Sequence, residues 1–338
     1  MVVVFCFTLQ KKGRLEMKRF SALVLVLAMA LTLTACSGGG SSGSQGTGSS
    51  GGDSSSTAGD GESQVTIPPV EDLTGVDTSA IPGVEDGVLT VGMECAYAPY
   101  NWMQMDDSNG AVPISNVAGS YANGYDVMIA KRICEAYGWE LEIVSSDWEG
   151  LTASIQSGVM DANIAGQSMT ADRLEEVDMA GPYFYATIVC VTTKDSANAE
   201  ATSIQELSGK CTAQTGTIWY DSCLPQIEGA EILPPAESAP AMIMQLQTGT
   251  ADFICTDLPT AMGAVAKDDN LVILNFSGTD GDFQFADEAE RAENVNIGIS
   301  VEKGNTQLVE AMDRVLSALN EEQFNALMDQ AIAIQPEI

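Results

Sequence analysis

The sequence predicts an α/β protein whose body consists of two related units. Its 338 residues exceed the size at which one hydrophobic core usually stops growing, so two packed units of roughly 100 to 150 residues each are expected. Short β-rich runs alternate with stretches of helical spacing in the order strand, helix, strand, helix, strand, which predicts a parallel sheet with crossover connections. The same alternation then starts again further along the chain.

The first unit begins with a β-rich run, and its helices show apolar residues at helical spacing. Glycine ends both helices, as expected at a helix C-terminus. The predicted elements are a strand at 87–95, a helix at 125–138, a strand at 139–146, a helix at 151–160 that ends at Gly158, and a strand at 161–166.

The second unit repeats this design without repeating the sequence. Its helix-to-strand joint "TGTADFICTD" resembles "SGVMDANIAG" of the first unit. The predicted elements are strands at 188–195 and 210–216, a helix at 239–249, a strand at 251–257 and a helix at 258–266. Residues 305–332 form one last long amphipathic helical region, which we expect to pack on a core.

Composition excludes several function classes. The formal net charge of -33 argues against nucleic acid, because phosphate binding needs clustered Lys and Arg. The chain has no histidine, which removes Ser-His-Asp and Cys-His nucleophile pairs and histidine zinc sites. Its eight cysteines contain no CxxC pair, and those of the body are expected to be buried free thiols. Cys211 and Cys223 are the only close pair. We expect no metal and no cofactor.

The N-terminal region is predicted to be an export signal followed by a flexible tether. From Met17, a candidate start, a basic segment leads into a short apolar run and then "LTAC", which is typical of a secretory leader over 1–35. "LTAC" resembles a bacterial lipoprotein processing box, which implies cleavage before Cys36 and lipidation of that residue. Residues 36–85 begin with a Gly/Ser tract that behaves as a flexible linker. No other segment of the sequence is apolar over a length that could cross a bilayer.

Several motifs follow one another in the body from about Gly87 to the C-terminus. They are "LTVGMECAYAPYNW", "GYDVMIAKRICEAYG", "DWEGLTASIQSGVMDANIAGQSMTADRLEEVDMAGPYFY", "CTAQTGTIWY", "ADFICTD" and "VNIGISVEKGN". In the order and spacing of these motifs the body resembles an extracellular solute-binding protein of an amino-acid ABC transporter, of the polar amino-acid class (family 3).

The resemblance implies a two-lobed, type II periplasmic-binding-protein-like fold with two crossing hinge strands and ligand in the cleft between the lobes. Lobe 1 would comprise 86–185 and 296–338, and lobe 2 would comprise 186–295. The hinges would then lie near 183–187 and 293–296. We expect the protein to be a monomer.

The stretch "GQSMTADR" at 166–173 carries the polar part of the implied site. Arg173 offers a planar fork that can hold a carboxylate through two hydrogen bonds; the alternative is a surface pair with Asp172 or Glu175. Gly166 would offer its carbonyl to the ligand ammonium group, assisted by the Ser168 hydroxyl.

Residues of the second unit and of two loops complete the implied site. Asp257 ends a strand and is the expected ammonium partner, with a helix N-cap as an alternative that could coexist. "QTGT" follows a strand and opens a helix, so its backbone N–H groups can hold the carboxylate. Gln214 and Thr217 of this loop, the aromatic Tyr97 and Trp148, and Glu94 match ligand positions of the family. Tyr100 is expected in the wall or core.

Two segments, 105–123 and 277–293, are longer than the family pattern and could cover the cleft or contact another protein. Their acids Asp106, Asp107, Asp280 and Asp282 lack calcium-loop spacing and are interpreted as solvated.

The expected function is the capture of a free polar or cationic L-amino acid by a receptor that delivers it to an ABC permease and ATPase. The receptor would be lipid-anchored at the outer face of the cytoplasmic membrane and would have no catalytic residues. Arginine, lysine, glutamine and cystine remain open as ligands. The alternatives are a secreted dehydratase acting on a prephenate-like acid, a ligand-sensing lipoprotein, and a structural or adhesive lipoprotein.

Overall fold

The computed structural model describes residues 65–336. The predicted leader, the lipidation site Cys36 and the Gly/Ser tract lie outside these residues. The described end of the predicted tether packs on the body, because Leu73 and Val84 are buried in the core. The Leu73 N–H also donates to the Ala136 carbonyl oxygen over 2.7 Å. The packed body therefore includes residues that the sequence assigned to the tether.

The first predicted unit forms a five-stranded sheet in the order β6-β1-β7-β14-β8. β1 pairs parallel with β6 and β7, whereas β14 pairs antiparallel with β7 and β8. The strands are β1 (Val88–Met93), β6 (Glu140–Ser145), β7 (Ala162–Ser168), β8 (Val177–Tyr185) and β14 (Asn296–Glu302). Every residue of β7 is buried, as expected for a central strand covered on both faces.

Two helices connect these strands as predicted, namely α1 (Tyr125–Tyr137) and α2 (Leu151–Gln156). A third short helix, α3 (Ala171–Glu176), was not predicted. The amphipathic α1 ends at Gly138, which adopts the left-handed conformation with φ of 73°, a conformation that a side chain would disfavour. A short helical turn, η2 (Trp148–Gly150), lies directly before α2.

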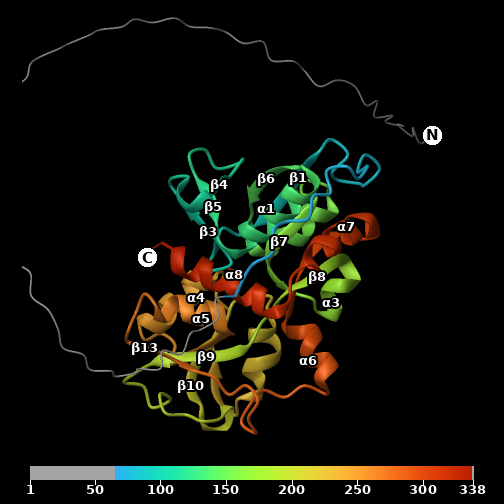
Figure 1. Ribbon diagram of the computed structural model, residues 1–338. Helices are drawn as coiled ribbons and strands as arrows, with labels where there is room; N and C mark the ends of the chain where they lie inside the picture. The colour runs from blue at the N-terminus through green and yellow to red at the C-terminus, as the bar shows by residue number, and fades with distance from the viewer. Residues whose placement is uncertain (1–64, 337–338) are drawn as a thin grey trace, which may run out of the picture. The chain divides into compact units, whose positions relative to one another are not determined.

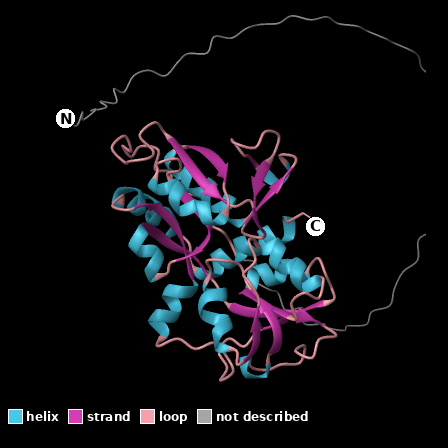
Figure 2. Cartoon of the chain, turned by 180° about the vertical axis from the view of Figure 1, so that it is seen from behind, coloured by secondary structure: helices cyan, strands magenta, loops and turns pink. Residues whose placement is uncertain are grey.

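The second predicted unit forms a sheet of the same design, in the order β11-β10-β12-β9-β13. β10 pairs parallel with β11 and β12, and β9 pairs antiparallel with β12 and β13. The elements are β9 (Ile188–Thr193), η3 (Ile204–Glu206), β10 (Ser208–Thr212), η4 (Trp219–Cys223), η5 (Leu224–Gln226), β11 (Gly229–Ile232), α4 (Ala239–Gln247), β12 (Phe253–Asp257), α5 (Leu258–Val265) and β13 (Leu271–Leu274). Helices lie beside the strands of both sheets (Figure 2). The predicted α/β class with a restart of the pattern is confirmed.

The chain runs between the two sheets at two adjacent places. β8 ends at Tyr185 shortly before β9, and α6 (Glu288–Val295) leads directly into β14. At this point Tyr185 pairs with Asn296, and the Ala186 N–H donates to the Val295 carbonyl oxygen over 3.1 Å. Both crossings coincide with the predicted hinges. Hinge movement itself stays a prediction, as do the exact lobe boundaries.

The longer segment 105–123 builds part of a small antiparallel sheet that the sequence analysis did not anticipate. Its order is β2-β3-β5-β4, and β3, β4 and β5 lie beside one another in Figure 1. The elements are β2 (Ala96–Tyr97), β3 (Asn101–Gln104), η1 (Ser108–Gly110), β4 (Val112–Pro113) and β5 (Tyr121–Asn123).

The C-terminal region contains two helices where the sequence analysis expected one. They are α7 (Thr306–Leu316) and α8 (Glu321–Ile334). Asn320 separates them, because its side chain accepts from the Gln323 N–H while the Gln323 side chain accepts from the Asn320 N–H. This reciprocal capping box satisfies two backbone donors and starts a new helix. No helix within 65–336 has the length and apolar character needed to span a membrane.

The six cysteines of the described body are all free and buried. Cys211 and Cys223 are therefore not joined, and the expectation of buried thiols is confirmed. Burial raises the pKa of Cys134 and Cys211 to about 12, which keeps these thiols protonated and unreactive at neutral pH.

The interpretation of Asp282 as a solvated acid is wrong. Asp282 is 5% exposed, and its carboxylate lies 2.7 Å from the Arg291 guanidinium. The Phe283 N–H donates to the other carboxylate oxygen over 2.8 Å. Both residues belong to the long segment 277–293, and the pair ties its loop part to α6, because Arg291 belongs to that helix.

Replacing Asp282 by alanine is expected to lower the free energy of unfolding by about 2–4 kcal/mol, because it leaves a partly buried arginine unpaired. The matched control is Glu71→Ala, which breaks the exposed pair with Arg314 and should cost no more than about 1 kcal/mol. Urea titration followed by circular dichroism measures both. Equal losses for the two variants would contradict a structural role for the Asp282 pair.

Candidate functional site

A cavity of about 300 Å³ lies between residues of the two sheet units. β7, η2 and α3 contribute from the first unit, and the loop after β10 with η4 contributes from the second. All predicted ligand residues except Glu94 and Asp257 line it, namely Tyr97, Trp148, Gly166, Ser168, Arg173, Gln214 and Thr217. The structure thus brings together residues that are far apart in the sequence.

Arg173 is the one basic residue in the lining of this cavity. It lies in α3, whose N-cap Thr170 accepts from the Arg173 N–H over 3.3 Å. The guanidinium donates to the Ser168 carbonyl oxygen and lies 5.8 Å from the centre of the Trp148 ring, a cation–π distance.

The alternative interpretation of Arg173 as half of a surface ion pair is not what the structure shows. Within residues 65–336, no carboxylate lies within 4.0 Å of its guanidinium. Burial lowers the pKa of Arg173 from its ordinary value, while the charge of Glu176 acts in the opposite direction. A guanidinium has five N–H donors, so one bond to Ser168 leaves donors that can bind a carboxylate.

The loop 214–217 follows β10 and enters the helical turn η4, as predicted. The Thr217 hydroxyl donates to the Gln214 carbonyl oxygen over 2.8 Å, and the Thr217 carbonyl accepts from Tyr220 and Asp221, each over 3.1 Å. These bonds fix the shape of the loop beside Trp148 and Arg173.

Asp257 lies outside the cavity lining and is 0% exposed. It caps α5, accepting from the Thr260 N–H over 2.9 Å, so the predicted N-cap is present. Its other carboxylate oxygen accepts from the Tyr97 hydroxyl over 2.5 Å. Burial raises the pKa of Asp257, and the bonds from Tyr97 and Thr260 counteract this rise. Its role as the ammonium partner stays a prediction.

Glu94 also contacts the other unit rather than the cavity. The Gln214 side-chain amide donates to its carboxylate over 3.2 Å. Together with the Tyr97–Asp257 bond, this contact joins the first unit to the second on one side of the cavity. Burial raises the pKa of Glu94 to about 7.

Several residues that line the cavity were missed by the sequence analysis. Trp219, Asp221 and Ser222 come from η4, and Glu176 from α3. Trp219 lies in the motif "CTAQTGTIWY", whose aromatic residues had no predicted role. Asn294, from the second crossing, had no local signal in the sequence.

The raised pKa of Glu94 predicts a specific pH dependence of stability. In the unfolded chain the group ionises near 4.5 and in the folded protein near 7, so the folded state holds the extra proton between these values. Its favourable contribution is present below about pH 4.5 and is lost as pH rises through 7.

The thermal midpoint of the unmutated protein should therefore fall by several degrees relative to that of Glu94→Gln between pH 4.5 and 8. Glutamine keeps an oxygen that can accept from Gln214 but does not ionise. Circular dichroism melts at a series of pH values measure the difference. A constant difference between the two proteins across this range would contradict the assignment.

Comparisons with known proteins identify relatives of this chain by sequence and by fold. The family of bacterial extracellular solute-binding proteins, family 3, matches residues 89–332. The L-cystine-binding protein TcyA of Bacillus subtilis (strain 168) is 25% identical over 236 residues, which are 70% of this chain and 77% of that protein.

Two solved structures share the fold. An amino acid ABC transporter substrate-binding protein from Streptococcus pneumoniae Canada MDR_19A, bound to L-arginine, has a TM-score of 0.62 at 24% identity, covering 76% of this chain and 98% of that one. The ancestral amino acid-binding protein AncCDT-1, a precursor of cyclohexadienyl dehydratase, has a TM-score of 0.58 at 23% identity, covering 73% and 96%. The predicted two-lobed, type II periplasmic-binding fold is confirmed.

Proposed function

Because the chain belongs to the bacterial extracellular solute-binding proteins, family 3, we propose that it captures a free polar or cationic L-amino acid and delivers it to the permease and ATPase of an ABC transporter. The observation that supports this most is Arg173, which lines the interlobe cavity and has no carboxylate partner within the described residues. The α-carboxylate of an amino acid fits the fork of its guanidinium.

Binding of the ligand ammonium group to Asp257 requires that the present contacts of Asp257 change. Asp257 is buried behind Tyr97, so a ligand ammonium must replace the Tyr97–Asp257 bond to reach the carboxylate. Opening of the lobes breaks this bond and the bond between Glu94 and Gln214. Ligand then closes the lobes by contacting both, so that affinity and closure are coupled.

Mass spectrometry of small molecules released from the purified protein on denaturation, followed by calorimetric titration with the twenty amino acids and cystine, tests this function. We expect one-to-one binding of a polar or cationic amino acid. Relatives at similar identity bind L-cystine or arginine by name, so these two are the first to titrate. Absence of binding to every amino acid would overturn the proposal.

A second candidate, dehydration of a prephenate-like acid, is favoured by one observation. The Glu94 carboxyl, whose pKa burial raises to about 7, is suited to donate a proton at neutral pH, but it bonds Gln214 outside the cavity lining, so lobe movement would have to bring it to the leaving group. The similarity to the precursor AncCDT-1 is compatible with it. Incubation with prephenate and detection of its dehydrated product decides between the two, and we expect no turnover.

We further propose that the receptor is a monomer held at the outer face of the cytoplasmic membrane by lipid on Cys36. The support is the leader and "LTAC" sequence before this residue. Changing Cys36 to Ser in cells should move the protein from the membrane fraction into the medium. Retention in the membrane fraction would contradict the anchor.

A further inference from the structure

A buried network of hydrogen bonds lies directly behind the cavity, and no predicted role accounts for it. Its centre is Asp126 of α1, which is 0% exposed. Its two carboxylate oxygens accept from the Asn101 side-chain amide and from the Tyr183 hydroxyl, each over 2.7 Å. The Tyr183 hydroxyl in turn accepts from the Gly166 N–H over 3.0 Å. The network therefore ends on a peptide of the cavity lining.

The network is costly for the fold. Burial raises the pKa of Asp126 to about 6, against the effect of its hydrogen bonds from Asn101 and Tyr183. No lysine or arginine within residues 65–336 forms an ion pair with it. A buried carboxylate without a cation depends on its hydrogen bonds for compensation. An apolar residue would fill the space at lower cost, which indicates that the network serves something besides stability.

The Gly166 peptide is restrained from its other side as well. Gly166 adopts a φ of 64°, and a Cβ atom there would lie 2.7 Å from the Tyr97 ring. The peptide is thus held between the ring of Tyr97, which lines the cavity, and the hydroxyl of Tyr183, which lies behind it. Only the Tyr183 side offers a hydrogen bond to the Gly166 N–H.

We propose that Tyr183 and Asp126 are positioning residues, which hold the backbone at Gly166 by its N–H so that the carbonyl of the same residue, in the next peptide unit, can receive the ligand ammonium group. This rests on the proposed function. Asp126 orients the Tyr183 hydroxyl by accepting its hydrogen bond, which leaves the hydroxyl lone pairs for the Gly166 N–H. Because Tyr183 lies near the end of β8, where the chain first crosses to the second lobe, the same hydroxyl links the backbone at Gly166 to the crossing.

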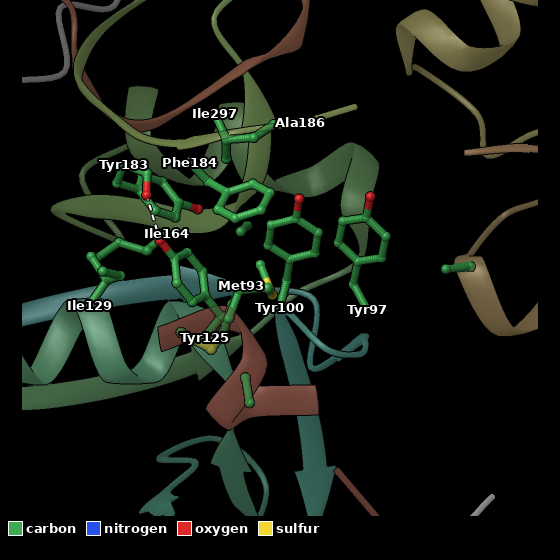
Figure 3. Packing of buried hydrophobic residues seen from close by; sticks show 14 of the residues in the cluster. Met93, Tyr97, Tyr100, Tyr125, Ile129, Ile164, Tyr183, Phe184, Ala186 and Ile297 are labelled. Carbon is green, nitrogen blue, oxygen red and sulfur yellow. Dashed lines mark hydrogen bonds between the residues drawn. The ribbon is translucent and has the colours of Figure 1, made fainter. Parts of the chain in front are cut away.

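The chain offers a matched control in the same aromatic cluster. Tyr125 is as buried as Tyr183 and stacks on it, with ring centres 5.8 Å apart. Its hydroxyl donates to the Tyr183 carbonyl oxygen over 2.5 Å, the bond drawn in Figure 3. Tyr125→Phe therefore removes one buried hydroxyl and one hydrogen bond. It leaves in place the hydrogen bonds that the Tyr183 hydroxyl forms with Gly166 and with Asp126.

Calorimetric titration of Tyr183→Phe and Tyr125→Phe with L-arginine and L-cystine tests the proposal. We expect Tyr183→Phe to weaken binding about tenfold or more, whereas Tyr125→Phe stays within about twofold of the unmutated protein. Asp126→Asn, which keeps an acceptor for the Tyr183 hydroxyl, should bind more tightly than Tyr183→Phe. Equal affinities for the two phenylalanine variants, in proteins that are folded by circular dichroism, would overturn the proposal.

A second measurement does not depend on a ligand. Hydrogen exchange of the Gly166 amide, followed by NMR, should be at least tenfold faster in Tyr183→Phe than in Tyr125→Phe, because only the first variant removes its acceptor. Equal exchange rates would overturn the inference even if binding is observed. If the unmutated protein binds no amino acid while the exchange rates differ as expected, the restraint on Gly166 stands and the proposed function fails.

Discussion

Arg173→Ala is expected to weaken binding of the amino-acid ligand by at least about 100-fold. Two hydrogen bonds from a guanidinium to a carboxylate contribute about 1.5–3 kcal/mol each, and every 1.4 kcal/mol is about a factor of ten in affinity. The cavity lining holds no other basic side chain to replace Arg173. Calorimetric titration with the ligand of the unmutated protein measures the loss.

Arg173→Lys is the control for charge. Lysine keeps the positive charge but lacks the planar fork, so we expect it to recover only a small part of the affinity. The substitutions also remove the bond to Ser168 and the contact with Trp148, so thermal midpoints should accompany the titrations. Tight binding that survives Arg173→Ala unchanged would exclude Arg173 as the carboxylate clamp.

Asp257→Asn is expected to abolish most of the binding while leaving the fold nearly as stable. Asparagine is as good an N-cap as aspartate, so it can still accept from the Thr260 N–H and hold the start of α5. It cannot neutralise a ligand ammonium group, and loss of a buried charged partner costs about 2–5 kcal/mol of binding. Calorimetry and urea titration separate the two effects.

Asp257→Ala should lose both binding and stability. Removal of the cap costs about 0.5–2 kcal/mol, and the buried Tyr97 hydroxyl loses its acceptor. The pair of variants therefore distinguishes a ligand partner from a structural cap. Unchanged binding by Asp257→Asn would assign Asp257 to the cap alone.

The fold could be predicted from sequence wherever the pattern is local. β1, β9 and β12 are short apolar runs and α1 is amphipathic with a glycine stop, so neighbouring residues carry the signal. β11 and β13 at the edges of the second sheet were not predicted. The break between α7 and α8 also has a local signal, the capping box from Asn320 to Gln323, but it lies within a continuous amphipathic pattern that hid it. The strands of the small sheet around β4 are too short for the alternation of apolar and polar residues that identifies a strand in a sequence.

The sequence indicated which residues belong to the candidate site better than it indicated which of them contact one another. The motif around Arg173 and the loop at Gln214 supplied five of the predicted residues that line the cavity, namely Gly166, Ser168, Arg173, Gln214 and Thr217. No spacing could show that Tyr97 bonds to Asp257, because 160 residues separate them. The Asp282–Arg291 pair was missed for another reason: an acid in a polar loop looks solvated until the burial of the loop is known.

The place of β14 in its sheet has a consequence for how the chain folds. β14 inserts between β7 and β8, so Ile297 pairs with Ser168 and with Phe184, residues that precede it by more than a hundred positions. The strands of the second sheet are contiguous in the chain from β9 to β13 and need no later segment. Because contacts between distant residues form slowly, the second lobe should acquire its structure first, and the first lobe should remain incomplete until β14 is available to pair with β7 and β8.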